Sequence, residues 1–337
     1  MNPPFTTNQL LMIRPARFGF NEQTGSTNTF QHKLQPETPQ LYEEKSTEGT
    51  AHDYSTAPDS AEKIAHQALC EFENSVSRLR AAGVEIRVWN DNPHPPKPDA
   101  VFLNNWFSTH PGGEFLLYPM MAENRRTEIV PAHIAELEKM GLKCGLDLSA
   151  QTSAGMFLEG TGSLVFDHRY RVVFATESPR THQKVAERVA LHLGYRLYFL
   201  TAIDEQAVPP YHTNVVLSVG PTLAVACLDA IVNPESNAML RQQLGRDDRC
   251  LIEISFAQMG MYCANVLEVQ NKDGEKLLIA SRTAWDAFSD IQRAQISRIM
   301  SPLILDIPII ERIGGGSARC MIAELFGVDA AFVNTAI

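Results

Sequence analysis

A thiol, an imidazole and a carboxylate stand at three points of this sequence and together could carry out a hydrolysis. Cys320 follows the glycine run 314–316 at the start of an apolar C-terminal segment. His212 follows a Pro-Pro-Tyr stretch, and Glu159 lies between apolar residues and a Gly-x-Gly turn. Nucleophilic catalysis needs this set, a nucleophile and a base that a third group holds in orientation.

Each of these residues also has a purely structural interpretation. A single cysteine is most often a small buried hydrophobic residue, and His212 could be a strand-edge histidine bonded to the backbone. Glu159 is harder to explain in this way, because a carboxylate among apolar residues costs free energy unless it is paired. We expect Ser317 to cap a short helix over 317–325, whose N-terminus would favour a Cys320 thiolate.

The elements that must position these residues recur with a period of about 55 residues. From residue 99 onward, four units each contain a β-hairpin, an amphipathic helix and a short apolar strand. The N-terminus supplies a fifth strand, helix and strand. Five units that each bury one helix face most simply close into a ring, whereas an open doubly wound sheet would lack the hairpins.

We therefore predict an α/β fold, a five-bladed propeller of pseudo-fivefold ββαβ units. In such a ring the first strand of each unit starts near a shared centre. The polar residues at these starts, Asp99, Asn105, Glu159, His212 and Asn214, should then converge, and Cys320 joins them on the glycine turn. The strongest alternative for Asn105 is a turn residue at the end of a strand.

The helix faces and the domain organisation follow from the same pattern. The apolar positions expected to face the blades are Ile64, Leu69, Phe72, Val76 and Leu79 in the N-terminal unit, and Phe288, Ile291 and Ile299 in the last. We predict one catalytic domain over 1–337. Residues 18–60 are polar and lack periodicity, which is typical of a lid or of disorder, and we interpret them as a long insertion that could act as a lid.

Composition excludes several classes of function. The formal net charge of -10 and the sequence pI near 5.5 argue against nucleic acid or an anionic membrane as a partner. We expect no signal peptide and no membrane span, because no long apolar run occurs. The six cysteines contain no CxxC pair. We expect a cytoplasmic protein with reduced thiols that acts on a small molecule. The sequence does not decide whether the chain forms a homo-oligomer.

Taken in chain order, the motifs resemble those of the guanidine-modifying superfamily, also called the amidinotransferase or pentein superfamily. It includes arginine deiminases, dimethylarginine hydrolases and glycine amidinotransferases, and the chain is most similar to bacterial citrulline hydrolases, or citrulline ureidases. The resemblance runs from MIRPARFGFNEQT to GGGSARCM through Asp-x-x-Phe with a polar pair, Glu-Gly and His-x-Asn. It implies a five-bladed α/β-propeller with its active site in the central channel, acting in arginine metabolism.

The resemblance also implies roles for individual residues. Cys320 would be the nucleophile, His212 the general acid and base, and Glu159 the carboxylate that orients the histidine and faces the substrate. Arg180 is similar to a family arginine that grips the substrate's α-carboxylate. Asp99 occupies a position that often contacts the amino-acid end. The resemblance implies no metal and no cofactor.

Two positions depart from the arginine-processing members, which usually have aspartates where this chain has Asn105 and Asn214. Those aspartates pair with a guanidinium, and a buried guanidinium without partners costs about 3–5 kcal/mol. A ureido group is neutral, and an amide NH₂ can donate to its carbonyl oxygen. We therefore predict hydrolysis of the ureido C–N bond of citrulline to ornithine, ammonia and carbon dioxide, through an S-carbamoyl intermediate on Cys320.

Three alternatives stay open. The first is an arginine deiminase or dimethylarginine hydrolase, since Glu159 alone could hold a cationic substrate. The second is a metal-dependent hydrolase using His168, His212 and Glu159, against which the lack of a short-spaced ligand motif argues. The third is a non-catalytic small-molecule sensor of the same fold, in which Cys320 would be unreactive.

Overall fold

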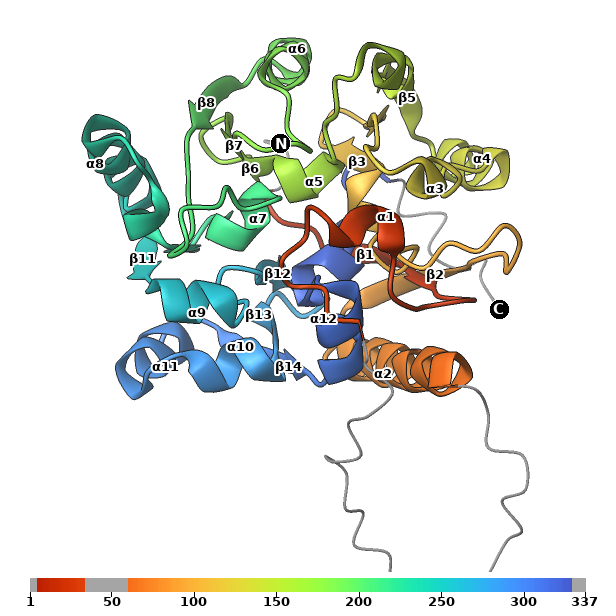
Figure 1. The fold of residues 1–337 in the computed structure, drawn as a ribbon. Coiled ribbons are helices and arrows are strands. Elements are labelled where there is room, and N and C mark those ends of the chain that lie inside the picture. Colours follow the sequence, from red (N-terminus) through yellow and green to blue (C-terminus); the bar gives the residue numbers. More distant parts are fainter. Residues whose placement is uncertain (1–4, 34–59, 329–337) are drawn as a thin grey trace, which may run out of the picture.

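A computed structural model of the chain describes residues 5–33 and 60–328, and these form five three-stranded sheets around a common centre (Figure 1). In every sheet two strands pair antiparallel and a third joins in parallel, and in four of the sheets the antiparallel pair is a hairpin. The sheets are β3 (Phe107–His110), β4 (Glu114–Leu117) and β5 (Lys143–Asp147); β6 (Val165–Asp167), β7 (Val172–Thr176) and β8 (Arg196–Leu200); β9 (Leu217–Val219), β10 (Leu223–Ala226) and β11 (Cys250–Glu253); β12 (Leu267–Gln270), β13 (Lys276–Ser281) and β14 (Ser301–Leu305); and β15 (Ala323–Glu324), β1 (Gln9–Arg14) and β2 (Glu85–Asn90). The predicted five-bladed α/β-propeller is confirmed.

The fifth blade is assembled from sequence-distant segments. β15 pairs antiparallel with β1, with Leu10 opposite Glu324, and so supplies the first strand that the N-terminal unit lacks. The helix that we expected over 317–325 is therefore wrong. The chain forms only the 3₁₀ turn η4 (Ala318–Met321) before β15 takes up backbone hydrogen bonds with β1.

Helices connect the second and third strands of each blade and cover the outside of the ring (Figure 1). They are α2 (Ser60–Ala81), α4 (Pro131–Lys139), α6 (Gln183–Leu193), α8 (Pro234–Leu244), and α10 (Arg282–Ala287) with α11 (Asp290–Ser297). Their apolar faces form the core against the sheets, as Phe72 and Val189 illustrate. No helix in the described ranges is long and apolar enough to cross a membrane.

In the blade of β12, β13 and β14, the prediction that Ile291 faces the sheet is wrong. Its helical segment breaks after Ala287, and Ser289 starts α11 with a capping box to Gln292. The break buries Phe288 but turns Ile291 outward, where it is 74% exposed instead of packed against the sheet. A periodic apolar pattern assumes one continuous helix, so the break shifts the face that follows it.

One-turn elements precede the first strands and carry the candidate residues. They are η1 (Leu103–Asn105) before β3, α5 (Gly160–Ser163) before β6, and α7 (Thr213–Val216) before β9. Asn105 lies within η1, while Glu159 and His212 directly precede α5 and α7. All three residues therefore lie in the turns that lead into the first strands, and not in the strands themselves.

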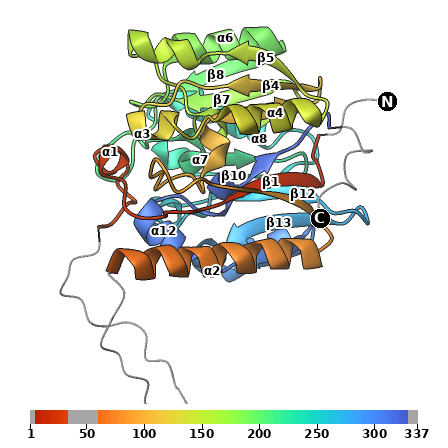
Figure 2. The same ribbon diagram turned by 90° about the vertical axis from the view of Figure 1, so that its right-hand side faces the viewer.

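Part of the predicted insertion 18–60 lies over the end of the ring that carries these turns. In the side view of Figure 2, α1 (Glu22–Gly25) and α12 (Pro308–Gly314) lie at the same end of the molecule. The Gln31 side chain donates to the Gly314 carbonyl at 2.9 Å, which joins this segment to the glycine run. Residues 34–59 lie outside the described residues.

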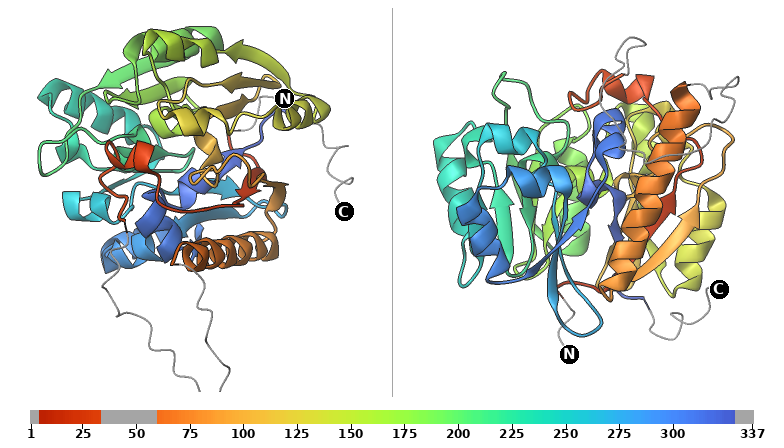
Figure 3. Two further views of the ribbon diagram at one scale, coloured as in Figure 1. Left: turned by 45° about the vertical axis from the view of Figure 1, so that its right-hand side comes forward. Right: turned by 90° about the horizontal axis from the view of Figure 1, so that it is seen from below.

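The long helix α2 holds the N-terminus of α12, which leads into the glycine run. α2 packs along β1 and β2 (Figure 3). Its Glu71 carboxylate accepts the backbone N–H groups of Ile309 at 2.9 Å and Ile310 at 3.0 Å. Burial raises the pKa of Glu71 to about 7, although both N–H groups act in the opposite direction.

Substituting Glu71→Gln is predicted to change how stability depends on pH. The folded protein holds the Glu71 proton up to about pH 7, whereas the unfolded chain releases it near 4.5. Wild-type stability therefore falls as the pH rises through this window. Between pH 5 and pH 7 the free energy of unfolding of the wild type should fall by about 1–3 kcal/mol relative to that of Glu71→Gln. Urea unfolding of both proteins at the two pH values measures this. A difference between the two proteins that is the same at pH 5 and pH 7 would contradict it.

Candidate active site

The structure brings all seven predicted site residues together where the turns converge. Five of them line one cavity, namely Asp99, Asn105, Arg180, His212 and Cys320. Glu159 is bonded to His212, with 2.8 Å between its Oε2 and the histidine Nε2. Asn214 donates from Nδ2 to the Cys320 sulfur at 3.5 Å. All seven side chains are buried; the catalytic role of each stays a prediction.

His212 and Glu159 form a buried pair that leaves the other histidine nitrogen, Nδ1, free to accept a proton. Burial opposes ionisation of Glu159, but Arg180 and His212 outweigh it and hold the pKa of this carboxyl well below its usual range. An ionised carboxylate only accepts hydrogen bonds, so the proton of His212 is on Nε2. Nδ1 has no partner among the described residues, and its lone pair can take up a proton.

The imidazole of His212 is neutral at pH 7. Burial lowers the pKa of His212 to about 4, although the hydrogen bond and the charge of Glu159 act to raise it. A neutral histidine is ready to act as a base. It does not supply a positive charge to a nearby thiolate.

The NH₂ group of Asn105 points away from Arg125, because Arg125 occupies the amide oxygen. Arg125 donates from Nη1 to Asn105 Oδ1 at 2.7 Å. A guanidinium only donates, so the amide oxygen must face it and Nδ2 must face away. Nδ2 has no partner among the described residues. A Cβ added at Gly162 would lie 2.6 Å from both this nitrogen and His212 Nδ1, so donor and lone pair lie side by side.

Arg125 is a site residue that sequence reasoning missed. It lies on α3 (Glu123–Arg126) and is buried, with Glu128 accepting from its Nε at 2.8 Å and its Nη2 at 3.0 Å. Burial opposes its charge, but Glu128 and Asp99 hold the pKa of Arg125 above its usual value. An Arg and a Glu three residues apart are typical of an exposed helical pair, so the local pattern gave no signal of burial.

Asn265 is the second residue that the sequence analysis missed. Its Nδ2 donates to the Cys320 sulfur at 3.2 Å, closer than the amide of Asn214. It lies two residues before β12, the first strand of the fourth unit, much as Asn214 lies three residues before β9, the first strand of the third. Equivalence between the repeated units was the signal that could have found it.

The expected helix N-terminus does not stand behind Cys320. The residue lies on the four-residue turn η4, and Ser317 makes no side-chain cap to it. The Ser317 hydroxyl donates instead to the Glu311 carboxylate at 2.6 Å. The prediction that a helix dipole favours the thiolate is therefore wrong.

Asp99 and Arg180 are bonded to the segment that covers the site. Asp99 accepts the Thr24 hydroxyl at 2.9 Å, and Arg180 donates to the Thr24 carbonyl at 2.9 Å and to the Thr27 hydroxyl at 2.6 Å. The cavity beneath measures about 10 Å³, room for about one water molecule. Asn28 of the same segment lines this cavity.

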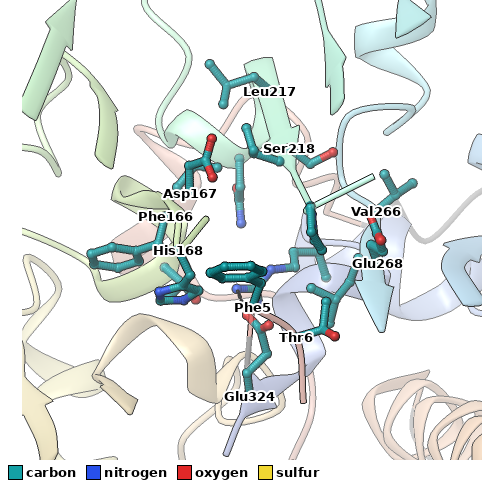
Figure 4. A pocket seen from close by; sticks show the side chains of 18 of the residues that line it. Phe5, Thr6, Phe166, Asp167, His168, Leu217, Ser218, Val266, Glu268 and Glu324 are labelled. Atoms are coloured by element: carbon teal, nitrogen blue, oxygen red, sulfur yellow. Dashed lines mark hydrogen bonds and ion pairs between the residues drawn. The ribbon is translucent and has the colours of Figure 1, made fainter. Parts of the chain in front are cut away.

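His168, the remaining residue of the metal-hydrolase alternative, lies in a different cavity. Figure 4 shows it there, in the turn after β6, with Phe166, Ser218 and Glu268 from β6, β9 and β12. His212 and Glu159 do not line this cavity. Within the described part of the chain, no three His, Cys, Asp or Glu side chains form a group that could hold a metal ion. The geometry does not support that alternative.

Comparison with known proteins identifies the family. The model of the family described as N,N dimethylarginine dimethylhydrolase, eukaryotic, matches residues 37–327. The chain therefore belongs to this family of hydrolases, within the guanidine-modifying superfamily that its motifs resemble. No curated protein is a match for the chain.

Solved structures share the fold at low sequence identity. The N-terminal domain of ArgZ, an arginine dihydrolase of the ornithine–ammonia cycle in cyanobacteria, has a TM-score of 0.67 at 16% identity, over 94% of this chain and 98% of that one. The complex of AgrE with L-arginine has a TM-score of 0.68 at 15% identity, over 96% of this chain and 41% of that one. An adduct of dimethylarginine dimethylaminohydrolase has a TM-score of 0.60 at 16% identity, over 95% of this chain and 100% of that one. The chain thus spans less than half of AgrE.

Gly162→Ala is predicted to lower kcat about 100-fold or more while the protein still folds. The new Cβ would lie 2.6 Å from Asn105 Nδ2 and His212 Nδ1, so both side chains must leave their positions. Gly260→Ala is the matched control, since a Cβ there meets nothing within 4 Å. Steady-state kinetics with a thermal melt of each variant measures this, and near-wild-type activity in Gly162→Ala would contradict the geometry.

His212 is predicted to stay neutral, with its proton on Nε2, from pH 8 down to about 5. The reason is its lowered pKa of about 4 together with the bond to ionised Glu159. Nitrogen-15 NMR of histidine-labelled protein measures both properties, and the spectrum of His212→Asn assigns the signal. A His212 that becomes charged near pH 6.5, or that carries its proton on Nδ1, would contradict the arrangement.

Proposed function

We propose that this member of the family hydrolyses the ureido C–N bond of a free α-amino acid, with citrulline as its substrate. The observation that carries the proposal is the orientation of Asn105, whose oxygen is taken by Arg125. Its NH₂ group and the His212 lone pair then form one donor and one acceptor side by side. A ureido group matches them with its C=O and an N–H, whereas a guanidinium offers only donors.

The reaction follows from these groups. The Cys320 thiol gives its proton to His212 Nδ1 while the sulfur bonds to the ureido carbon, and the Asn105 NH₂ stabilises the negative oxygen. His212 returns the proton to the leaving nitrogen as the C–N bond breaks. A water molecule, deprotonated by His212, then attacks the acyl carbon and releases the thiol. The carbamate decomposes, so the products are ornithine, ammonia and carbon dioxide.

Asp99 and Arg180 support an α-amino acid as the substrate. A carboxylate and a guanidinium at one end of the cavity suit the α-ammonium and α-carboxylate groups. The covering segment already offers each a partner of that kind, a Thr24 hydroxyl hydrogen to Asp99 and a Thr24 carbonyl oxygen to Arg180. Substrate binding would exchange these contacts for contacts with the ligand.

A guanidino substrate is the second candidate, and the comparisons favour it. The family model carries the name of dimethylarginine, and the similar structures include an arginine dihydrolase and a complex with L-arginine. Glu159 and Asp99 could face a cation. Against this, two guanidinium groups, Arg125 and Arg180, are already buried at the site, and Glu159 is bonded to His212 and Arg180.

Product analysis separates the candidates. The full chain is incubated separately with citrulline, arginine and N,N-dimethylarginine, and ornithine, ammonia and citrulline are quantified. Ornithine and ammonia from citrulline, at least about 100-fold faster than turnover of either guanidino compound, are expected because an unpaired guanidinium is costly. Cys320→Ala is the inactive control. Citrulline accumulating from arginine or from dimethylarginine would make the second candidate correct.

Asn105→Asp sharpens this test. A carboxylate still accepts from Arg125 but has no hydrogen to donate, so citrulline turnover should fall by about 100-fold or more. Any turnover of arginine should rise relative to that of citrulline. Asn214→Asp, which makes the same change at an amide bonded to the Cys320 sulfur, is the matched variant. Unchanged citrulline turnover in Asn105→Asp would remove the observation on which the proposal depends.

A further inference from the structure

Neither a helix N-terminus nor an imidazolium, the two groups that commonly favour a catalytic thiolate, serves the Cys320 sulfur. Its turn η4 has four residues and is not an α-helix, so it carries little of a helix macrodipole. His212 is neutral at pH 7 and provides no positive charge. A buried thiolate still needs hydrogen-bond donors, because its desolvation is costly. The donors that the structure provides are side-chain amides.

Asn265 meets the sulfur with a donor whose direction is fixed. Its Nδ2 lies 3.2 Å from Cys320 Sγ, and its Oδ1 accepts the backbone N–H of Arg319 at 3.0 Å. A backbone N–H can only donate, so the oxygen must face Arg319 and the NH₂ must face the sulfur. One side chain thus holds both the nucleophile and the backbone directly before it. Asn265 is 1% exposed, so bulk water does not compete for these bonds.

Two further contacts hold Asn265 in place. Its backbone N–H donates at 2.8 Å to the carbonyl of Tyr262, a residue in the left-handed region at φ 61°. The Tyr262 hydroxyl in turn donates to the Glu311 carbonyl on α12 at 3.2 Å. Asn214, by comparison, is 3.5 Å from the sulfur and its Oδ1 has no partner among the described residues. Asn265 is therefore the better oriented donor.

We propose that Asn265 is a catalytic residue whose Nδ2–H donates to Cys320 and stabilises the thiolate. The hydrogen bond from Asn265 stabilises the negative charge on the sulfur when the thiol proton moves to His212, and again when the sulfur leaves the acyl intermediate as an anion. An oriented donor in a dry site stabilises such charge without rearranging. The inference rests on the proposed function only in that Cys320 is the nucleophile, and not on which substrate is used.

Alkylation of Cys320 by iodoacetamide tests this without any substrate. Iodoacetamide reacts with the thiolate, and peptide mass spectrometry separates Cys320 from the other cysteines. In Asn265→Leu the rate at pH 7 should fall by about 10- to 100-fold, the effect of a hydrogen bond to a charged group, and the rate-against-pH curve should move to higher pH. Asn237→Leu, which removes an amide bonded to a backbone carbonyl on another blade, is the matched control and should behave as wild type.

Asn265→Asp covers the case in which Asn265→Leu does not fold. It is isosteric and keeps the acceptor for the Arg319 N–H, but places a negative oxygen beside the sulfur. Its alkylation should be at least as slow, with the same displacement of the pH curve. A loss that is equal at every pH, or wild-type rates in both variants, would overturn the role of Asn265. A Cys320 that does not react in the wild type would instead overturn the proposed function.

Discussion

The hydrogen bond from Arg125 to Asn105 is the constraint on which the rest of the site depends. Both side chains are buried, and a guanidinium cannot accept, so the bond fixes which end of the amide a ligand meets. Glu128 keeps the charge of Arg125 compensated, so that this orientation does not leave an unpaired buried cation. With His212 held by Glu159, one donor and one acceptor result, a pattern complementary to a ureido group.

The propeller makes this possible without a contiguous motif. Each blade begins with a turn before its innermost strand, so chain segments more than 200 residues apart deliver side chains to one end of the ring. The blade completed by β15 and β1 places Cys320 in the same way as the others place Asn105 and Asn265. The segment at Thr24 then covers these residues and bonds to Asp99 and Arg180.

The sequence predicted more of the fold than of the site's electrostatics. Hairpins and apolar helix faces are local patterns, so the ring and the convergence of six of the site residues could be predicted from them, whereas Arg180 was predicted only from the family resemblance. Local sequence could not show that the predicted helix over 317–325 is wrong, because β15 forms only by pairing with β1. Arg125 was missed because its burial depends on Asn105 and Glu128 in three dimensions. The choice of substrate likewise depends on the tertiary structure. The orientation of the Asn105 amide favours a ureido substrate, whereas the family comparisons favour a guanidino substrate.

Calorimetric titration of the inactive Cys320→Ala protein with citrulline and with arginine shows which group the site prefers. Citrulline and arginine have nearly the same shape and differ in the charge and hydrogen-bond pattern of the group that faces Asn105. Citrulline should bind about 100-fold or more tightly than arginine, because an unpaired guanidinium is costly to bury. Arginine binding as tightly as citrulline, or more tightly, would contradict it and would show that the site is built for a guanidinium.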